Sequence, residues 1–227
     1  MFKKIAVVVV LALAGFLAFA ATRPETYHVE RSASIAAPAQ IVFNNVDNFK
    51  TWTAWSPWDK LDLQMKRTVS GPPQGVGAAY AWEGNKKVGK GSMTITAVQA
   101  PTSATYRLEF LEPFAAVATT LFTIVPEGQT ASTITWAIDG NNNFAGKIFS
   151  IFVNMDQTLG ADFEKGLAAL KIIAEDQAKT AAAAEAAAQA QADADAAAAK
   201  AQADAAAANA QEEAAVAEEA AKGKRKR

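Results

Sequence analysis

Residues 77–97, GAAYAWEGNKKVGKGSMTITA, contain the pattern that decides the fold. In the first half, Ala78, Tyr80 and Trp82 alternate with alanines, which is the period-two spacing of a strand that buries one face. A Glu-Gly-Asn turn follows, and a second alternating run occupies the rest of the stretch. The stretch therefore predicts two antiparallel strands joined by a short connection.

The same period extends in both directions from this hairpin. Turn residues such as Pro, Gly and Asn separate several of the runs. Strands spaced so closely leave no room for crossover helices, so we expect an antiparallel meander. Together with the two strands of the quoted stretch, we expect strands at 27–35, 65–70, 103–111, 117–126 and 132–139.

The segment after the first strand carries a cluster of tryptophans. A helical insert is expected there, and Pro57 ends it. The sequence TWTAWSPWDK, residues 51–60, holds Trp52, Trp55 and Trp58. Three large rings exceed what a single cap on the core requires, and tryptophan suits an edge that is half apolar and half wet. Trp55 and Trp58 are therefore candidates for the mouth of a ligand cavity, with core packing as the alternative.

A long helix is expected after the last strand. The three asparagines at 141–143 are good N-cap residues. Gly160 and Gly166 lie within the predicted helix and indicate that it approaches another element closely. The apolar positions of this helix step by three or four, as in a helix packed along one face: Ile148, Phe152, Met155, Leu159, Phe163, Leu167 and Leu170.

Residues 1–21 have the composition of a membrane or export signal. Two lysines precede an uncharged apolar run at 5–21. Because this run just reaches the length needed to span a bilayer, an uncleaved anchor is favoured over a signal peptide cleaved near Ala20. An anchor would keep the lysines in the cytoplasm, and residues 22–26 would be a spacer to a domain outside it.

The composition excludes most familiar active sites. The chain has no cysteine, which removes disulfides, thiol nucleophiles and thiolate metal sites. His28 is the only histidine; we expect it on the polar side of the first strand, without a partner base or nucleophile. We therefore predict no catalytic constellation, no metal site and no cofactor. The net charge of −1 gives no reason to expect a nucleic-acid partner.

The composition changes abruptly after Ile173. Residues 174–221 are mostly alanine with scattered Glu, Asp and Gln, and the basic sequence KGKRKR follows at 222–227. Alanine forms helix readily, but this segment has almost nothing to bury, so a solvated, fraying helix or a disordered tail is predicted. An anionic envelope surface is a candidate partner for the basic tip, and a solubilising end is the alternative.

Four segments resemble a known superfamily: VERSASIAAPAQIVF (29–43), WTAWSPWDKLD (52–62), GVGAAYAWEGNKKVGKGSMTIT (75–96) and MDQTLGADFEKGLAALK (155–171). They are similar to the SRPBCC superfamily, and more narrowly to its bacterial membrane-associated members labelled polyketide cyclase/dehydrase-like. The resemblance covers 27–173 and implies an α+β helix-grip (START-like) fold, in which a seven-stranded antiparallel sheet curves around the C-terminal helix. Such proteins usually enclose a cavity for an apolar or amphipathic ligand between sheet and helix.

Eight residues are candidates for contacting that ligand. Seven are aromatic residues of the insert and of inward-facing strand positions, and for each of them core packing alone is the alternative. Arg31 shares the parity of apolar residues in the first strand, so it could meet a ligand headgroup or snorkel to water at an edge. The predicted ligand-binding residues are Arg31, Trp55, Trp58, Tyr80, Trp82, Phe110, Phe122 and Trp136.

Three functions from different classes are compatible with these features. The favoured one is a membrane-tethered domain of the bacterial cell envelope, outside the cytoplasm, that binds a small hydrophobic or amphipathic molecule. The second is a cyclase-type enzyme acting on a polyketide-like substrate in the same cavity, which would require a buried polar group such as Arg31. The third is an envelope structural or adaptor protein that acts through the alanine-rich tail.

Overall fold

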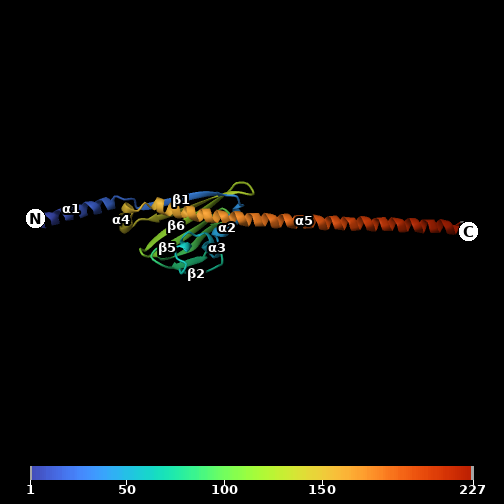
Figure 1. Cartoon of the computed structure of the whole chain (residues 1–227), viewed down its shortest axis with the longest axis horizontal. Coiled ribbons are helices and arrows are strands. Elements are labelled where there is room, and N and C mark those ends of the chain that lie inside the picture. Colours follow the sequence, from blue (N-terminus) through green and yellow to red (C-terminus); the bar gives the residue numbers. More distant parts are fainter. Residues whose placement is uncertain (1, 226–227) are drawn as a thin grey trace. The chain divides into compact units, whose positions relative to one another are not determined.

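The structure is a computed structural model that describes the backbone of residues 2–225 and the side chains of residues 2–217. The chain divides into two compact units, the first ending at Ala178 and the second beginning at Lys179. Helix α1 (Phe2–Ala21) opens the first unit, and it is long and apolar enough to cross a membrane. A seven-stranded sheet and the helices that pack against it form the rest of this unit (Figure 1).

The sheet is antiparallel throughout and has the order β1-β7-β6-β5-β4-β3-β2. It is therefore a meander from β2 to β7, with β1 added beside the last strand. All seven predicted strands are confirmed, with ends that shift by at most a few residues. The strands are β1 (Thr26–Ile35), β2 (Lys66–Ser70), β3 (Ala79–Glu83), β4 (Lys90–Gln99), β5 (Ser103–Glu112), β6 (Ala116–Pro126) and β7 (Ser132–Asn141).

The hairpin of β3 and β4 shows how sequence sets the register. Tyr80 pairs with Met93 and Trp82 pairs with Gly91. A β-carbon on Gly91 would lie 2.5 Å from a ring carbon of Trp82, so the glycine leaves the space that the indole occupies. The indole N–H of Trp82 donates to the carbonyl oxygen of Val88 at 3.0 Å, which holds the ring against the connection between the strands.

The insert after β1 forms two short helices, α2 (Ala39–Val46) and α3 (Phe49–Trp55), and a single turn of 3-10 helix, η1 (Trp58–Lys60). The side chain of Asn48 caps α3 by accepting a hydrogen bond from the backbone N–H of Lys50 at 3.0 Å. Pro57 follows α3, as the sequence predicts. This arrangement places the tryptophan cluster between the insert and the sheet.

The predicted long C-terminal helix is confirmed, but the prediction that it begins directly after residue 143 is wrong. Two helices follow, α4 (Phe144–Phe152) and α5 (Met155–Arg225), with Val153 in an extended conformation between them. Asn154 begins the second helix, because its side chain accepts a hydrogen bond from the N–H of Gln157 at 3.2 Å. The apolar spacing continues across the break, so periodicity alone did not reveal it.

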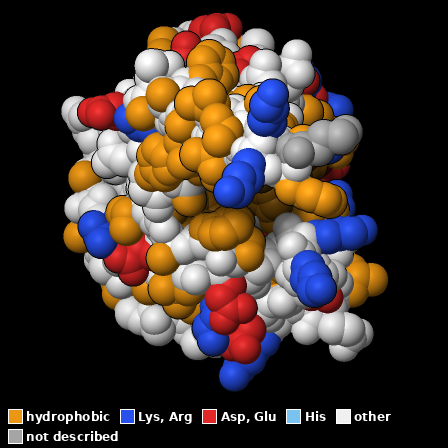
Figure 2. All heavy atoms as spheres, turned by 90° about the vertical axis from the view of Figure 1, so that its left-hand side faces the viewer, with side chains coloured by type: hydrophobic (Ala, Val, Ile, Leu, Met, Phe, Trp, Pro, Cys, Tyr) orange, Lys and Arg blue, Asp and Glu red, His pale blue; other side chains and the backbone are white. Residues whose placement is uncertain are grey.

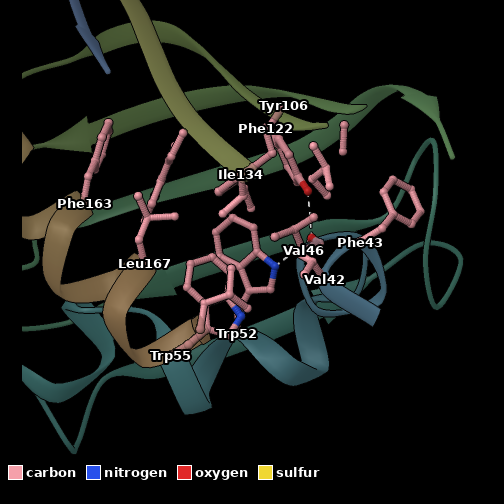
Figure 3. Packing of buried hydrophobic residues seen from close by; sticks show 14 of the residues in the cluster. Val42, Phe43, Val46, Trp52, Trp55, Tyr106, Phe122, Ile134, Phe163 and Leu167 are labelled. Atoms are coloured by element: carbon pink, nitrogen blue, oxygen red, sulfur yellow. Dashed lines mark hydrogen bonds between the residues drawn. The ribbon is translucent and has the colours of Figure 1, made fainter. Parts of the chain in front are cut away.

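Helix α5 packs across the inner face of the sheet through Phe163, Leu167 and Leu170, all of which are almost fully buried. Figure 3 shows Phe163 and Leu167 of this helix together with Trp52 and Trp55, which come from α3, and Phe122 and Tyr106, which come from the sheet. The predicted close approach at Gly166 is confirmed, because a β-carbon there would lie 2.8 Å from Trp136. The described side chains of the second unit are exposed, and the side chains of the basic tip at 222–227 lie outside the described residues.

Candidate functional site

A cavity of about 170 Å³ lies between the insert, the inner face of the sheet and the first turns of α5. Its wall is mostly apolar and aromatic, which is the usual lining of a site for an organic ligand. The lining residues are Trp52, Ser56, Trp58, Asp59, Met65, Tyr80, Trp82, Lys87, Val88, Met93, Leu108, Phe110, Thr120, Trp136, Ile138, Leu159 and Phe163.

Five of the eight predicted ligand-binding residues line this cavity. They come from η1, β3, β5 and β7, so the fold brings together positions that are far apart in the sequence. The five are Trp58, Tyr80, Trp82, Phe110 and Trp136. Their rings contact one another at angles: the centroids of Trp58 and Trp136 are 5.6 Å apart and those of Trp82 and Phe110 are 6.1 Å apart. These edge-to-face contacts are favourable and fix the ring orientations.

Trp55 and Phe122 lie behind the cavity wall. Both side chains are fully buried, and neither lines the cavity. Their rings meet edge to face with centroids 6.0 Å apart, and the indole N–H of Trp55 donates to the carbonyl oxygen of Asn45 at 3.2 Å. Trp55 therefore packs in the core, whereas Trp52 and Trp58 of the same cluster line the cavity.

Trp52 joins the insert to the cavity wall. Its indole N–H donates to the carbonyl oxygen of Val46 at 2.8 Å, and the hydroxyl of Tyr106 donates to the same oxygen at 2.7 Å. The last turn of α2 is thereby connected to both α3 and β5. Burial raises the pKa of Tyr106 well above its usual value, which keeps this phenol protonated as a donor.

Arg31 occupies a different place from the cavity. It faces α5, where its guanidinium forms ion pairs with Asp156 (Nη1–Oδ1, 2.9 Å) and Glu164 (Nε–Oε1, 2.9 Å). A β-carbon at Gly160 would lie 2.1 Å from the guanidinium, so this glycine permits the close approach of helix and arginine. The predicted close approach of α5 is thus confirmed here too, and the guanidinium is occupied by helix carboxylates.

The structure adds a polar group that the sequence analysis did not identify. Asp59 is buried in the wall, and its Oδ1 atom accepts hydrogen bonds from Arg67 Nε at 2.5 Å and from the Tyr80 hydroxyl at 3.3 Å. Burial, reinforced by the Asp59 carboxylate, raises the pKa of Tyr80, so that the phenol stays protonated near neutral pH. An acidic residue beside Trp58 was the only sequence signal, because its partner Arg67 comes from a different element, β2.

Three further polar side chains line the cavity without a hydrogen bond or ion pair to a described residue. The hydroxyls of Ser56 and Thr120 belong to almost fully buried residues, whereas Lys87 is exposed. The buried indole N–H of Trp136 also lacks a partner within the described part of the chain. Residues 2–217 contain no cluster of three or more His, Asp or Glu side chains that could hold a metal ion.

This architecture agrees with a sequence comparison. A profile of the family described as "Polyketide cyclase / dehydrase and lipid transport" matches residues 26–175, about two thirds of the chain. The chain belongs to this family. The family assignment and the fold place residues 26–175 in the SRPBCC superfamily, as a domain of the hydrophobic-ligand-binding or cyclase-like kind. No curated protein matches the chain in sequence.

Two solved structures are similar to this domain. Truncated norcoclaurine synthase from Thalictrum flavum is 13% identical with a TM-score of 0.50, over 65% of this chain and 92% of its own. The ginseng major latex-like protein 151 from Panax ginseng is 12% identical with a TM-score of 0.49, over 66% of this chain and 99% of its own. At 13% identity, the similarity to norcoclaurine synthase indicates a shared fold and nothing more.

Proposed function

We propose that the chain is a membrane-tethered domain, outside the cytoplasm, that binds a small hydrophobic or amphipathic molecule in its cavity. The observation that carries this proposal is the cavity itself, whose apolar wall is contributed by the insert, the sheet and α5 together. Apolar surface lining a cavity gains free energy when an apolar ligand displaces water from it. The membership of the family supports the same function.

Binding is favoured over catalysis by the state of Asp59 and Tyr80, the two buried titratable groups in the wall. The carboxylate of Asp59 is already engaged by Arg67 and Tyr80. The raised pKa of Tyr80 makes its phenol a poor base at neutral pH. General acid–base catalysis requires a group that exchanges a proton near the working pH. These side chains instead serve as fixed hydrogen-bonding and structural groups.

The tether is supported by the length and exposure of α1. Its 20 residues would span roughly 30 Å as a helix, which matches the hydrocarbon core of a bilayer. Nearly all of its side chains are exposed. Lys3 and Lys4 at its start favour a cytoplasmic N-terminus, which puts the cavity domain on the other side.

Helix α4 supports the same placement. None of its residues is buried, and Phe144, Phe149 and Phe152 are exposed. The ring of Phe152 lies 6.2 Å from that of Phe16 in α1, so the two apolar surfaces are continuous. Figure 2 views the molecule from the N-terminal side, where hydrophobic side chains gather among lysine and arginine side chains. We infer that α4 lies in the membrane interface beside the anchor.

Native mass spectrometry of the full chain, purified in mild detergent from a native-like host, tests the binding function. We expect an added mass of one small organic molecule. The cavity-filling variant Met93→Trp should lose this adduct, whereas Leu111→Trp, which adds the same ring at an exposed position outside the cavity, should retain it. A protein without an adduct that also fails to bind apolar fluorescent dyes would show that the proposal is wrong.

Labelling of single cysteines tests the tether, because the natural chain has none. Gln129→Cys lies in the exposed turn between β6 and β7, and Lys3→Cys lies at the other end of α1. In intact cells, a membrane-impermeant maleimide should label the first variant and not the second. The opposite pattern would place the domain in the cytoplasm, and recovery of the protein without membranes would contradict the anchor.

A further inference from the structure

The charges of the cavity wall are not balanced. Among the residues that line the cavity, Asp59 and Lys87 are the charged ones. Asp59 forms an ion pair with Arg67, so its charge is compensated. The ammonium of Lys87 forms no ion pair with any described residue. The cavity wall, counted together with Arg67, therefore carries one uncompensated positive charge, at Lys87.

Two acidic residues of this region, Glu83 and Asp62, contact groups other than Lys87. Glu83, at the end of β3, forms an ion pair with Lys90 at 3.1 Å. Asp62 accepts a hydrogen bond from the backbone N–H of Asn85 at 2.7 Å. Because Lys87 forms no ion pair with a described residue, an anionic group of a ligand could pair with it without displacing an existing ion pair.

The size of the cavity limits the apolar part of the ligand. An apolar cavity of roughly 150 Å³ accommodates benzene. The observed volume of about 170 Å³ is therefore suited to one ring or a short aliphatic chain, and it is too small for two acyl chains. Trp58, Trp82 and Phe110 are half-buried in the wall and present their rings to such a group.

The buried part of the cavity wall offers hydrogen bonds. The hydroxyls of Ser56 and Thr120 lie in the wall without partners among the described residues, although their residues are only 4% and 3% exposed. A hydroxyl can donate and accept, so these two groups suit a second polar substituent on the ring.

We propose that the cavity selects a ring-sized organic acid, with its carboxylate at Lys87 and its apolar body between the rings of the wall. This inference rests on the proposed binding function and adds the chemical class of the ligand. The exposed position of Lys87 places the carboxylate at the open end of the cavity, where it keeps part of its hydration. Lysine acts here as a point charge, so the selectivity is electrostatic and weakens as salt increases.

The test uses three probes with the same ring and chain length: 3-phenylpropanoate, 3-phenylpropan-1-ol and 3-phenylpropylamine. Binding to the full chain in detergent is followed by intrinsic fluorescence, because Trp52, Trp58, Trp82 and Trp136 line the cavity. At pH 7 and low salt, we expect the acid to bind on the order of 10-fold more tightly than the alcohol, and the amine to bind most weakly.

Variants assign the preference to one side chain. Lys87→Met should reduce the affinity for the acid to that for the alcohol, and Lys87→Arg should retain most of the preference. Lys86→Met is the matched control, because Lys86 precedes Lys87 in the same exposed connection and does not line the cavity. Lys87 is exposed, so these variants should unfold at the same temperature as the natural protein.

The outcomes separate this inference from the proposed function. Equal affinities for the acid and the alcohol, tighter binding of the amine, or an acid preference that survives Lys87→Met would each overturn the inference. In all three cases the cavity would still bind apolar molecules, so the proposed function would stand. If none of the probes binds and no adduct co-purifies, the proposed function fails together with the inference.

Discussion

His28 Nδ1 and Asp139 Oδ1 lie 2.7 Å apart, joining two residues that face each other directly across β1 and β7. The sequence did not predict a partner for His28, because 111 residues separate the pair in the chain. The hydrogen bond to Asp139 raises the pKa of His28 above its usual value, and Glu30 adds to this effect at 3.5 Å. A raised pKa stabilises the fold at low pH; this contribution is lost as the pH rises through the pKa of the folded protein.

We therefore expect an NMR titration of His28 to give a pKa above the usual histidine value. The chain has one histidine, so the ring signals need no further assignment. Asp139→Asn should lower this pKa toward the usual value, and Glu30→Gln, which removes the longer contact, should lower it less. An unchanged pKa in Asp139→Asn would contradict the assignment of the shift to that hydrogen bond.

Trp55 and Trp58 should respond differently to truncation. Trp55 is fully buried and lies outside the cavity, so Trp55→Ala should lower the free energy of unfolding by about 3–5 kcal/mol. Trp58 is half-buried and lines the cavity, so Trp58→Ala should weaken probe binding with a smaller loss of stability. Denaturant unfolding and fluorescence titration measure the two effects. Equal losses of stability in the two variants would show that Trp58 is a core packing residue like Trp55.

Gly166→Ala should destabilise the protein although alanine favours helix. The new methyl group would lie 2.8 Å from Trp136 and 3.1 Å from Pro57, and such overpacking costs about 1–3 kcal/mol. The gain in helix propensity is only about 0.5–1 kcal/mol. Gly160→Ala is the contrast, because its methyl group meets the end of the flexible Arg31 side chain, which can move. Thermal unfolding should show the larger loss at Gly166, and the reverse order would contradict the packing described here.

The placement of α4 in the membrane interface predicts a local change of environment. Phe152→Cys carrying an environment-sensitive dye should show blue-shifted emission in lipid nanodiscs, because Phe152 is 74% exposed beside α1. Val125→Cys is the control, because Val125 is also exposed but lies far from α1. It pairs with Thr133 near the first residue of β7, whereas Tyr27, which follows α1 closely in the chain, pairs with Gly140 near the last. If both dyes report water, α4 lies away from the membrane.

Alternating residues predicted the sheet well because six of the seven strands bury residues on one face, β2 being the exception. The period-two pattern around Tyr80 and Trp82 locates strands to within a few residues, since a slip by one residue would expose the apolar face. The break between α4 and α5 was missed because the helical pattern of apolar residues does not change there. The apolar spacing continues from Phe152 to Met155, and only the capping bond of Asn154 distinguishes two helices from one.

The cavity could be predicted only in part. Five of the seven aromatic residues that the sequence predicts line the cavity, yet the sequence could not tell Trp55, which packs behind the wall, from Trp58, which lines it. That difference depends on how α3 and η1 meet the sheet. Asp59 and Lys87 were missed because their significance comes from the presence or absence of a partner in space.

The wall of the cavity combines residues of the hydrophobic core with exposed or half-buried residues of a hairpin. Trp136 and Phe163 stack with centroids 4.2 Å apart and belong to the core, so substitutions there would disturb the whole domain. Lys87 and Val88 belong to the hairpin near the free edge of the sheet and are exposed or half-buried. Ligand preference could therefore diverge during evolution through the hairpin, while the stability of the domain is maintained by the opposite wall. The same division makes this hairpin the natural place for an engineer to randomise.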